Sequence, residues 1–192
     1  MDRAAGGLGQ MEVGVSSYCR VAPGHPVHHE YHATEHGFPQ RAEAMLFERL
    51  CLEIMQAGLS WEIVLKRRAG MAEAFGGWAV DRVAALDDAG RAALLGNPAI
   101  IRNRLKLDAI IANARRVQAM RASHGGFAGW LDAHHPRGKP DWVRLFRETF
   151  RFTGGEIVGE FLMSLGYLPG AHAEDCPMLA TLRTLAPPWM NT

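Results

Sequence analysis

The sequence predicts an all-α protein, and three observations support that class. Apolar residues recur at helical spacing in several stretches, most clearly over residues 41–57 and 102–122. No stretch of useful length alternates apolar and polar residues as a half-buried strand does. The chain also carries no internal repeat, and its 192 residues are enough for one good core with room for a second small lobe.

The first predicted helix covers residues 41–57, where apolar side chains repeat on one face. Gly58 ends this helix, because glycine breaks a helical pattern. Ser60 then caps a second helix, which begins at Trp61 and runs to the basic residues 66–68.

The remaining segments follow in order along the chain. Further helices are predicted over residues 81–86, 89–95, 102–122, 141–150 and 157–165. Asn97-Pro98 interrupts the helical pattern. Residues 18–39 are rich in His, Pro and Gly, and residues 130–139 are polar with Pro and Gly, so we expect both to be loops.

Composition narrows the functional classes. Hydrophobic residues make up 48% and charged residues 21%, which is ordinary for a globular protein. The net charge of +1 argues against a protein that binds nucleic acid through basic tails, although it leaves room for a local basic stripe.

No apolar run approaches membrane-spanning length, and the Gly-rich residues 1–17 lack the apolar region of a signal peptide. We therefore expect a cytoplasmic protein with a flexible tail at 1–17, one domain over 18–180 and a C-terminal tail at 181–192.

Two pairs of soft metal ligands stand at opposite ends of the chain. Cys19 and His32 lie near the start, and His172 and Cys176 lie near the end. Zinc accepts two thiolates and two imidazoles, so these residues predict a structural zinc site that fixes one end of the domain to the other. With four protein ligands the metal has no open position for catalysis. Neighbouring histidines are possible rival ligands, namely His25, His28, His29 and His36.

Several short motifs lie between these pairs. The longest is Leu-Cys-Leu-Glu-Ile-Met-Gln-Ala-Gly-Leu-Ser-Trp over residues 50–61, and Tyr-His-x-x-Glu-x-Gly covers residues 31–37. Others are Ala-Ile-Ile-Arg-Asn-Arg at 99–104 with Ala-Ile-Ile-Ala-Asn-Ala at 109–114, and Phe-Arg-Phe-Thr-Gly at 150–154. Together they resemble the motifs of the DNA-3-methyladenine glycosylase I family, and the resemblance runs from residue 19 to residue 176.

The resemblance implies a fold, an activity and a cofactor. The family belongs to the helix-hairpin-helix DNA glycosylases, excises 3-methyladenine from alkylated DNA and carries a structural zinc. The four zinc positions of this chain are in register with it. We therefore expect a helix-hairpin-helix fold whose zinc clasp joins the N- and C-terminal segments.

The same resemblance assigns a base-binding pocket. Glu53 lies among apolar residues on one helix face, where a carboxylate needs a partner. One interpretation is a structural hydrogen bond to the Ser60 backbone. The resemblance favours the other, in which Glu53 lies at the pocket floor, contacts the cationic flipped base and acts as the electrostatic catalytic residue. Trp61 and Tyr31 would then form opposite walls that stack on the base, although each could instead be a core residue.

The family lacks the aspartate that supports the sugar cation in related glycosylases, so Asp132 and Asp141 are not assigned as nucleophiles.

DNA is expected to bind at the hairpin before the long helix, with Arg102, Arg104 and Lys106 at its phosphates. Residues 66–68 form a possible second basic bank, and the alternative for all of these charges is a solvated helix face. The expected partner is double-stranded DNA containing alkylated bases, bound by a monomer without a membrane.

This chain departs from the family pattern near the pocket and the clasp. The altered positions are Val21, His28, Ala33, His36, Gly155, Glu156, Gly159 and Glu160. They remove aromatic residues and add two carboxylates, which favours weaker discrimination among cationic bases. Two further hypotheses stay open, namely a paralogue that excises another damaged base and a catalytically silent zinc-containing DNA-binding module.

Overall fold

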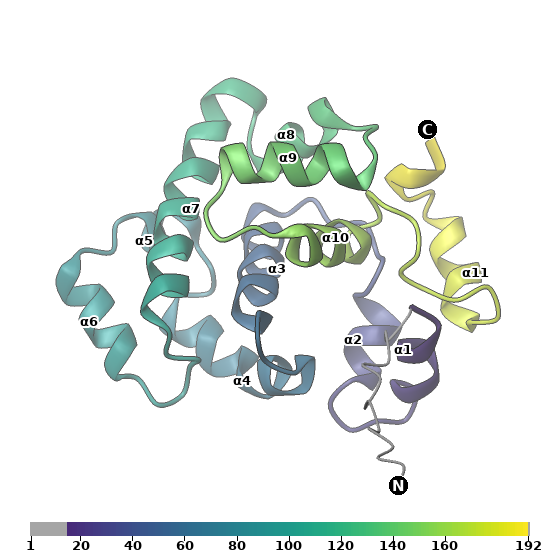
Figure 1. The fold of residues 1–192 in the computed structure, drawn as a ribbon, viewed down its shortest axis with the longest axis horizontal. Coiled ribbons are helices and arrows are strands. Elements are labelled where there is room, and N and C mark those ends of the chain that lie inside the picture. The colour runs from purple at the N-terminus through teal and green to yellow at the C-terminus, as the bar shows by residue number, and fades with distance from the viewer. Residues whose placement is uncertain (1–14, 192) are drawn as a thin grey trace, which may run out of the picture.

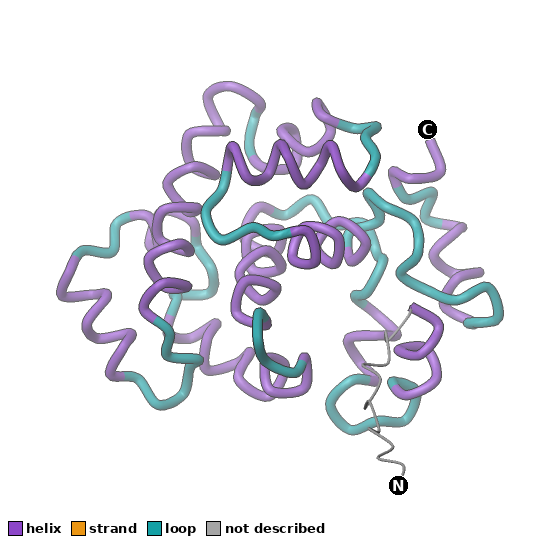
Figure 2. Tube along the Cα trace, in the orientation of Figure 1, coloured by secondary structure: helices purple, strands orange, loops and turns teal. Residues whose placement is uncertain are grey.

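The computed structural model describes residues 15–191, and these residues form helices and loops without a strand (Figure 1, Figure 2). The all-α prediction is therefore confirmed for the described residues. Within that range no helix has both the length and the apolar character that crossing a bilayer requires. The elements in chain order are α1 (Val15–Val21), α2 (His29–Thr34), α3 (Glu43–Gln56), α4 (Trp61–Ala74), α5 (Val80–Ala84), α6 (Asp88–Gly96), α7 (Arg104–His124), α8 (Phe127–His134), α9 (Lys139–Thr149), α10 (Gly155–Ser164), α11 (Pro177–Thr184) and the 3₁₀ turn η1 (Pro188–Asn191).

Helix α3 is the centre of the molecule. Every residue from Leu46 to Met55 is buried, and α3 packs against α4, α5, α7, α8 and α10. A helix buried all round is normally apolar all round. Here three of the buried positions are Glu48, Arg49 and Glu53, and each of these polar groups requires a partner or a function.

Glu48 and Arg49 find their partners in an ion-pair network. Arg68 of α4 donates to a Glu48 oxygen at 2.9 Å and to a Glu35 oxygen at 2.7 Å. Arg49 donates to the second Glu35 oxygen at 2.5 Å, and its guanidinium lies over the Tyr31 ring at 4.8 Å from the centroid. The network therefore holds α4 and the end of α2 against α3, and it fixes the position of Tyr31.

The connection between α6 and α7 is held by local hydrogen bonds and close packing. Asn103 caps α7 by accepting the Lys106 N–H at 3.2 Å, and the predicted break at Pro98 lies in the connection from α6. Gly70 of α4 allows a close approach there, because a Cβ at this position would lie 2.7 Å from the Ala99 carbonyl oxygen. The connection thus packs directly on α4.

The two ends of the described chain meet on one side of the molecule, where α1 and α2 lie near α11 (Figure 1). Gly37, with φ of +88°, makes the closest approach, since a Cβ there would lie 2.8 Å from the Ala171 Cβ. The Gly37 N–H also donates to the Ser164 carbonyl at 2.8 Å. A glycine is required here both for its left-handed conformation and for the contact.

Three segments differ from the sequence prediction. Residues 130–139 were expected to form a loop, but Trp130 and Leu131 are buried in α8. The expected loop at 18–39 contains α1 and α2, and these helices are too short to show a helical period. The expected C-terminal tail includes the end of α11, where Leu182 is buried.

Of the expected N-terminal tail, residues 1–14 lie outside the described residues, whereas residues 15–17 belong to α1. The other predicted helices are present with shifted ends. The largest shift is in α4, which continues past the basic residues 66–68 to Ala74. Ser60 caps α4 as predicted, and Gly58 follows α3 in the left-handed conformation, with φ of +77°.

Candidate functional site

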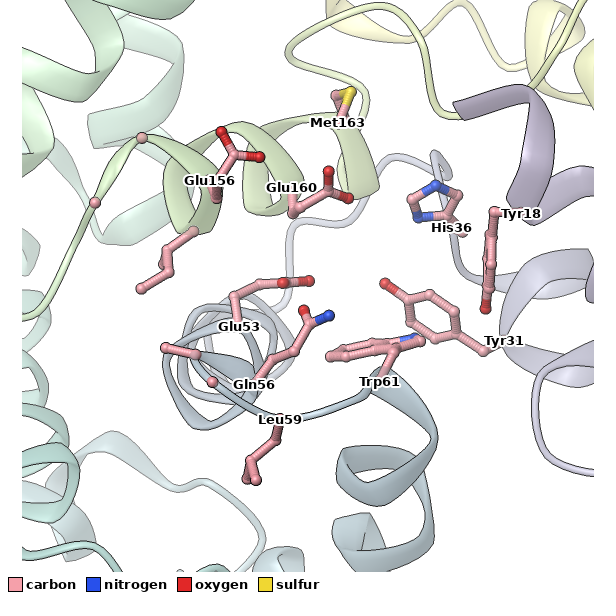
Figure 3. Close-up of a pocket in the computed structure, with 15 residues that line it drawn as sticks. Tyr18, Tyr31, His36, Glu53, Gln56, Leu59, Trp61, Glu156, Glu160 and Met163 are labelled. Carbon is pink, nitrogen blue, oxygen red and sulfur yellow. The ribbon is translucent and has the colours of Figure 1, made fainter. Parts of the chain in front are cut away.

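A cavity of about 650 Å³ opens between the α1–α2 segment and the rest of the helices (Figure 3). Its floor and one side come from α3 and the turn after it, and another side comes from α10. Aromatic residues of α1, α2 and the start of α4 close the remaining side. The lining residues are Tyr18, Tyr31, His36, Glu53, Gln56, Ala57, Gly58, Leu59, Trp61, Gly154, Gly155, Glu156, Ile157, Glu160 and Met163.

Glu53 projects from α3 into this cavity and is only 4% exposed. Burial raises the pKa of its carboxyl to about 8, and the negative charge of Glu160 adds to the shift, while Arg49 opposes it. The carboxylate faces the cavity. Glu53 and Ser60 both lie in the described part of the chain, and the Glu53 carboxylate forms no hydrogen bond with the Ser60 backbone there. The alternative of a purely local structural bond is therefore not observed.

The aromatic wall has a different shape from the one predicted. Tyr31 and Trp61 contact each other edge to face, with ring centroids 5.1 Å apart, so they do not stand on opposite sides of the cavity. His36 continues the wall at 5.7 Å from Tyr31, and Tyr18 lies 5.5 Å from His36. The rings form one concave aromatic surface that faces α10 across the cavity (Figure 3).

The two added carboxylates line the opposite side. Glu160 points from α10 toward the space above Glu53, and burial is the main cause that raises its pKa (Figure 3). Glu156 lies one turn earlier at the rim, where Lys139 Nζ is 3.7 Å from its carboxylate. Gly159 leaves room for that lysine, because a Cβ at this position would lie 2.8 Å from Lys139 Nζ. The cavity is therefore an acidic space bounded by aromatic rings.

The four predicted metal ligands converge beside the aromatic wall. Cys19 Sγ lies 3.4 Å from His32 Nε2 and 3.7 Å from His172 Nδ1. Cys176 Sγ lies 3.7 Å and 3.5 Å from the same two nitrogens. A tetrahedral zinc with ordinary bond lengths gives sulfur–nitrogen edges of about 3.6 Å, so the donor set and its spacing fit that ion.

The surroundings of this cluster also suit a metal. His172 Nε2 lies 2.7 Å from the His36 carbonyl oxygen, which fixes the tautomer and leaves Nδ1 free to ligate. The Ala173 N–H lies 3.4 Å from Cys19 Sγ, as expected for a donor to a thiolate. These contacts orient two of the four ligand side chains.

The rival histidines are less suited to the role. His25, His28 and Glu62 do form a second group whose ligand atoms lie within 4.8 Å of one another. However, His25 Nδ1 accepts the backbone N–H groups of Val27 and His28 at 3.2 and 3.3 Å. That arrangement places the proton on the other ring nitrogen, so the His25 ring offers no free lone pair to a cation.

Three rivals remain. His28 Nδ1 lies 3.5 Å from the Tyr18 hydroxyl oxygen, and His29 and His36 belong to neither group. His29 is exposed, and its Nδ1 accepts the Gly24 N–H at 3.1 Å. His36 is buried and supports His172 through its backbone carbonyl while its ring lines the cavity. Of the two converging groups within the described residues, the predicted four is the one that supplies the two thiolates and two imidazoles that suit zinc.

The predicted DNA-binding residues separate into two groups. Arg102 and Arg104 are exposed at the hairpin, whereas Lys106 is buried and points inward. Its ammonium group donates to the carbonyl oxygens of Met55 and Ala57 at 2.9 and 2.5 Å. The expectation that Lys106 contacts phosphate is therefore corrected, because Lys106 satisfies the last carbonyls of α3.

The basic residues 66–68, the second predicted DNA-binding group, also form their contacts within the protein. Lys66 pairs with Glu62 at 2.6 Å, and Arg67 donates to the Pro98 carbonyl at 2.5 Å. Arg68 belongs to the buried network around Glu35. The sequence could not separate these charges from free ones, since spacing alone does not give their partners.

Neither unassigned aspartate lines the cavity. Asp132 accepts hydrogen bonds from Arg41 at 2.7 Å and Tyr167 at 2.6 Å. Asp141 pairs with Arg144 at 2.6 Å. Both carboxylates therefore have structural partners, in agreement with their exclusion from the site.

Several lining residues were not predicted from the sequence. Tyr18 precedes the ligand Cys19, and its proximity in sequence is the signal that could have identified it. Gln56 lies nearly one turn after Glu53 on the same helix, a spacing that places both on one face. Met163 carries no such signal, and its place in the lining depends on how α10 packs on α3.

A concave aromatic surface beside the buried carboxylate of Glu53 and facing the carboxylate of Glu160 defines a binding site for a flat, positively charged ligand. The sequence matches the methyladenine glycosylase family over residues 21–141. It is 38% identical to DNA-3-methyladenine glycosylase 1 of Escherichia coli K12 over 170 residues, which cover 79% of this chain and 90% of the relative. It is 31% identical to the DNA-3-methyladenine glycosylase of Haemophilus influenzae over 167 residues, covering 77% and 90%.

The fold agrees with these sequence matches. The structure of 3-methyladenine DNA glycosylase I from Staphylococcus aureus, described for its recognition of 3-methyladenine, superposes with a TM-score of 0.76 at 28% identity. The match covers 86% of this chain and 97% of that one. The chain belongs to the methyladenine glycosylase family.

The buried carboxylate generates a prediction about stability. Because the pKa of Glu53 is about 8 in the folded protein and near 4.5 in the unfolded chain, only the folded state keeps this proton between those pH values. The free energy of unfolding should therefore fall as pH rises from about 4.5 to 8, by on the order of a few kcal/mol. Glu53→Gln should remove this contribution and gain stability over wild type at pH 8, measured by denaturant unfolding across pH.

Glu156→Gln is the matched control, since it removes a carboxylate of the same cavity whose side chain is 90% exposed. This variant should keep the fall in stability that Glu53 causes, since it leaves Glu53 in place. Equal pH dependence in wild type and Glu53→Gln would contradict the raised pKa.

Proposed function

We infer that this protein is a DNA glycosylase of base-excision repair that hydrolyses the N-glycosidic bond of 3-methyladenine in alkylated DNA. The observation that carries this conclusion is Glu53, a carboxylate buried at the floor of an aromatic cavity in a chain of the methyladenine glycosylase family. A flipped base fits such a site because it is flat, and a methylated one because it is cationic.

The reaction demands little acid or base chemistry from the protein. Methylation at N3 gives the adenine a positive charge, so the electrons of the breaking C1′–N9 bond neutralise the departing base. The sugar develops oxocarbenium character, the oxygen of a water molecule bonds to C1′, and the water releases its proton to solvent. The protein must chiefly bind the nucleotide in its extrahelical, reactive position.

The cavity supplies the charge that this binding needs. The ionised Glu53 attracts the cationic base, and the faces of the aromatic surface add cation–π attraction. An unmodified adenine is neutral and remains paired in the duplex, so it gains less from the cavity and costs more to flip. Selection therefore rests on charge as well as on shape.

Glu160 favours a second candidate, in which the same chemistry acts on another cationic base. This carboxylate faces the cavity from α10, opposite the aromatic surface. It adds a hydrogen-bond acceptor for any base that presents further N–H donors, such as 3-methylguanine.

The proposal includes a structural zinc ion. Cys19, His32, His172 and Cys176 would hold it, and their spacing and donor types support this choice. A closed site of this kind contributes folding energy and supplies no catalytic water. The residues next to the ligands, Tyr18 and Tyr31, would then be held in the wall of the cavity.

We further propose that the protein acts on duplex DNA as a monomer in the cytoplasm, where reducing conditions keep the thiols available. The connection between α6 and α7 would serve as the hairpin of a helix-hairpin-helix module. Its exposed residues Arg102 and Arg104 support contacts to phosphate, together with the N–H groups at the start of α7.

The test of the function is release of free base from methylated duplex DNA, with the products resolved chromatographically. We expect 3-methyladenine as the main product, with some 3-methylguanine because Glu160 broadens acceptance of cations. Release of a neutral lesion alone would favour the paralogue hypothesis. No methylated purine at any enzyme concentration, with DNA binding intact, would favour a silent binding module.

Glu53→Gln should lower kcat/KM for 3-methyladenine by about 10- to 100-fold, the scale of a hydrogen bond to a charged partner. The wild-type kcat/KM should also rise with pH toward about 8, because the cationic base binds the ionised form of Glu53. The variant should lack this rise. Unchanged excision by the variant at every pH would assign Glu53 a structural role.

Purified protein should contain one zinc ion per chain by elemental analysis, and chelation should lower its melting temperature before it alters the chemical step. Cys176→Ser should lose the metal. His29→Gln is the matched control, because this exposed histidine lies outside the four-residue cluster, and it should keep the metal. Metal-free protein whose melting temperature does not respond to chelator would exclude the site.

A further inference from the structure

Phe152 is an aromatic residue that the function described above does not use. It lies in the loop between α9 and α10, is 40% exposed and has φ of +60°. A left-handed backbone is unfavourable for a residue with a Cβ, so it persists only where the surroundings impose it. A glycine would meet this geometry at lower cost.

The surroundings hold this loop from both sides of Phe152. Asn113 of α7 is completely buried, and its side chain forms two hydrogen bonds with Arg151, accepting from the N–H at 2.7 Å and donating to the carbonyl at 3.0 Å. The buried Thr153 hydroxyl lies 3.1 and 3.3 Å from the carbonyl oxygens of Phe146 and Phe150. The fold thus fixes the loop while leaving the Phe152 ring exposed.

The exposed ring stands beside the mouth of the cavity. The residues that follow the loop, Gly154 and Gly155, line the cavity. On the other side, Lys106 Nζ lies 5.9 Å from the Phe152 ring centroid and 2.5 Å from the carbonyl of Ala57, another lining residue. The loop and the turn after α3 therefore form one continuous rim.

This rim continues onto the surface proposed to bind DNA. Lys106, which lies 5.9 Å from the ring centroid, is two residues after the exposed Arg104, so the ring packs beside the first turn of α7. If the hairpin binds DNA as proposed, an aromatic face at this place would meet the duplex beside the nucleotide that leaves the stack. Base faces exposed by flipping are apolar, and aromatic side chains stack on them.

We propose that Phe152 is a DNA-stacking residue, whose ring packs on a base that becomes exposed when the damaged nucleotide enters the cavity. This inference rests on the proposed glycosylase function. The hydrogen bonds of Arg151 and Thr153 hold the backbone on both sides of Phe152 before DNA arrives, so little ordering of the loop is needed on binding. Phe152 would act on the duplex and would not touch the base in the cavity.

The test compares Phe152→Gly with wild type on the same methylated oligonucleotide in duplex and in single-stranded form. Glycine accepts the positive φ, and this gain offsets part of the packing lost with the ring, so the variant should still fold, which its melting curve checks. We expect kcat/KM on the duplex to fall by about 10- to 100-fold, as for the loss of one stacked base. Single-stranded substrate should change little, because its base is already unpaired. Inhibition by free 3-methyladenine should not change.

Leu185→Ala is the matched control, since it truncates an apolar side chain that is 50% exposed near α11 and away from the rim. It should leave both activities unchanged. A 2-aminopurine placed opposite the damaged base reports stacking independently, and its fluorescence response to binding should differ between wild type and Phe152→Gly.

Equal losses on both substrates, or full activity of Phe152→Gly on the duplex, would overturn the proposal. If wild type releases no base from either substrate, the glycosylase function fails instead. The 2-aminopurine signal then still decides whether Phe152 stacks on DNA, because it depends on binding and not on bond cleavage.

Discussion

The site depends on the convergence of Cys19, His32, His172 and Cys176. These residues come from both ends of the domain, and each of the first two is preceded by a tyrosine of the aromatic surface. The position of that surface against α3 and α10 therefore depends on a contact between segments that are remote in sequence. A metal ion at the cluster would stabilise the ligand-binding geometry and the fold together, because the same side chains determine both.

The floor of the cavity shows a conflict between stability and binding. A buried carboxylate is costly, and the free protein reduces that cost by keeping Glu53 protonated up to a pKa of about 8. In the proposed function the cationic base needs the ionised form and stabilises it on binding. The carboxylate that weakens the folded protein at higher pH would then be the group that makes the cavity selective for charge. Glu160 increases both effects, since its charge opposes ionisation of Glu53 and attracts the same cation.

Hydrogen bonds from buried side chains hold the backbone around the cavity in place. The last carbonyls of α3 bind the Lys106 ammonium, and the loop before α10 is fixed by Asn113. The side chains of Lys106 and Asn113 are polar and buried, and their hydrogen bonds hold the rim of the cavity. Fixing the rim in advance lowers the ordering cost of binding a flexible duplex. The hydrogen bonds to the last carbonyls of α3 also explain why Lys106, although it lies in a basic run, points away from solvent.

The helical class, the long helices with a clear apolar period and the breaks at Gly58 and Asn97-Pro98 could all be predicted from the sequence. So could the two Cys–His pairs proposed to hold a metal and the carboxylate of Glu53 on an apolar helix face. Each of these has a local signature or a distinctive residue type. The tertiary structure alone decided that α2 and α8 are helices, that Lys106 is buried and that Tyr31 contacts Trp61 on the same wall. Those features depend on which segments pack across from one another. A pattern along the chain specifies which face of a helix is apolar, but it does not specify what that face meets.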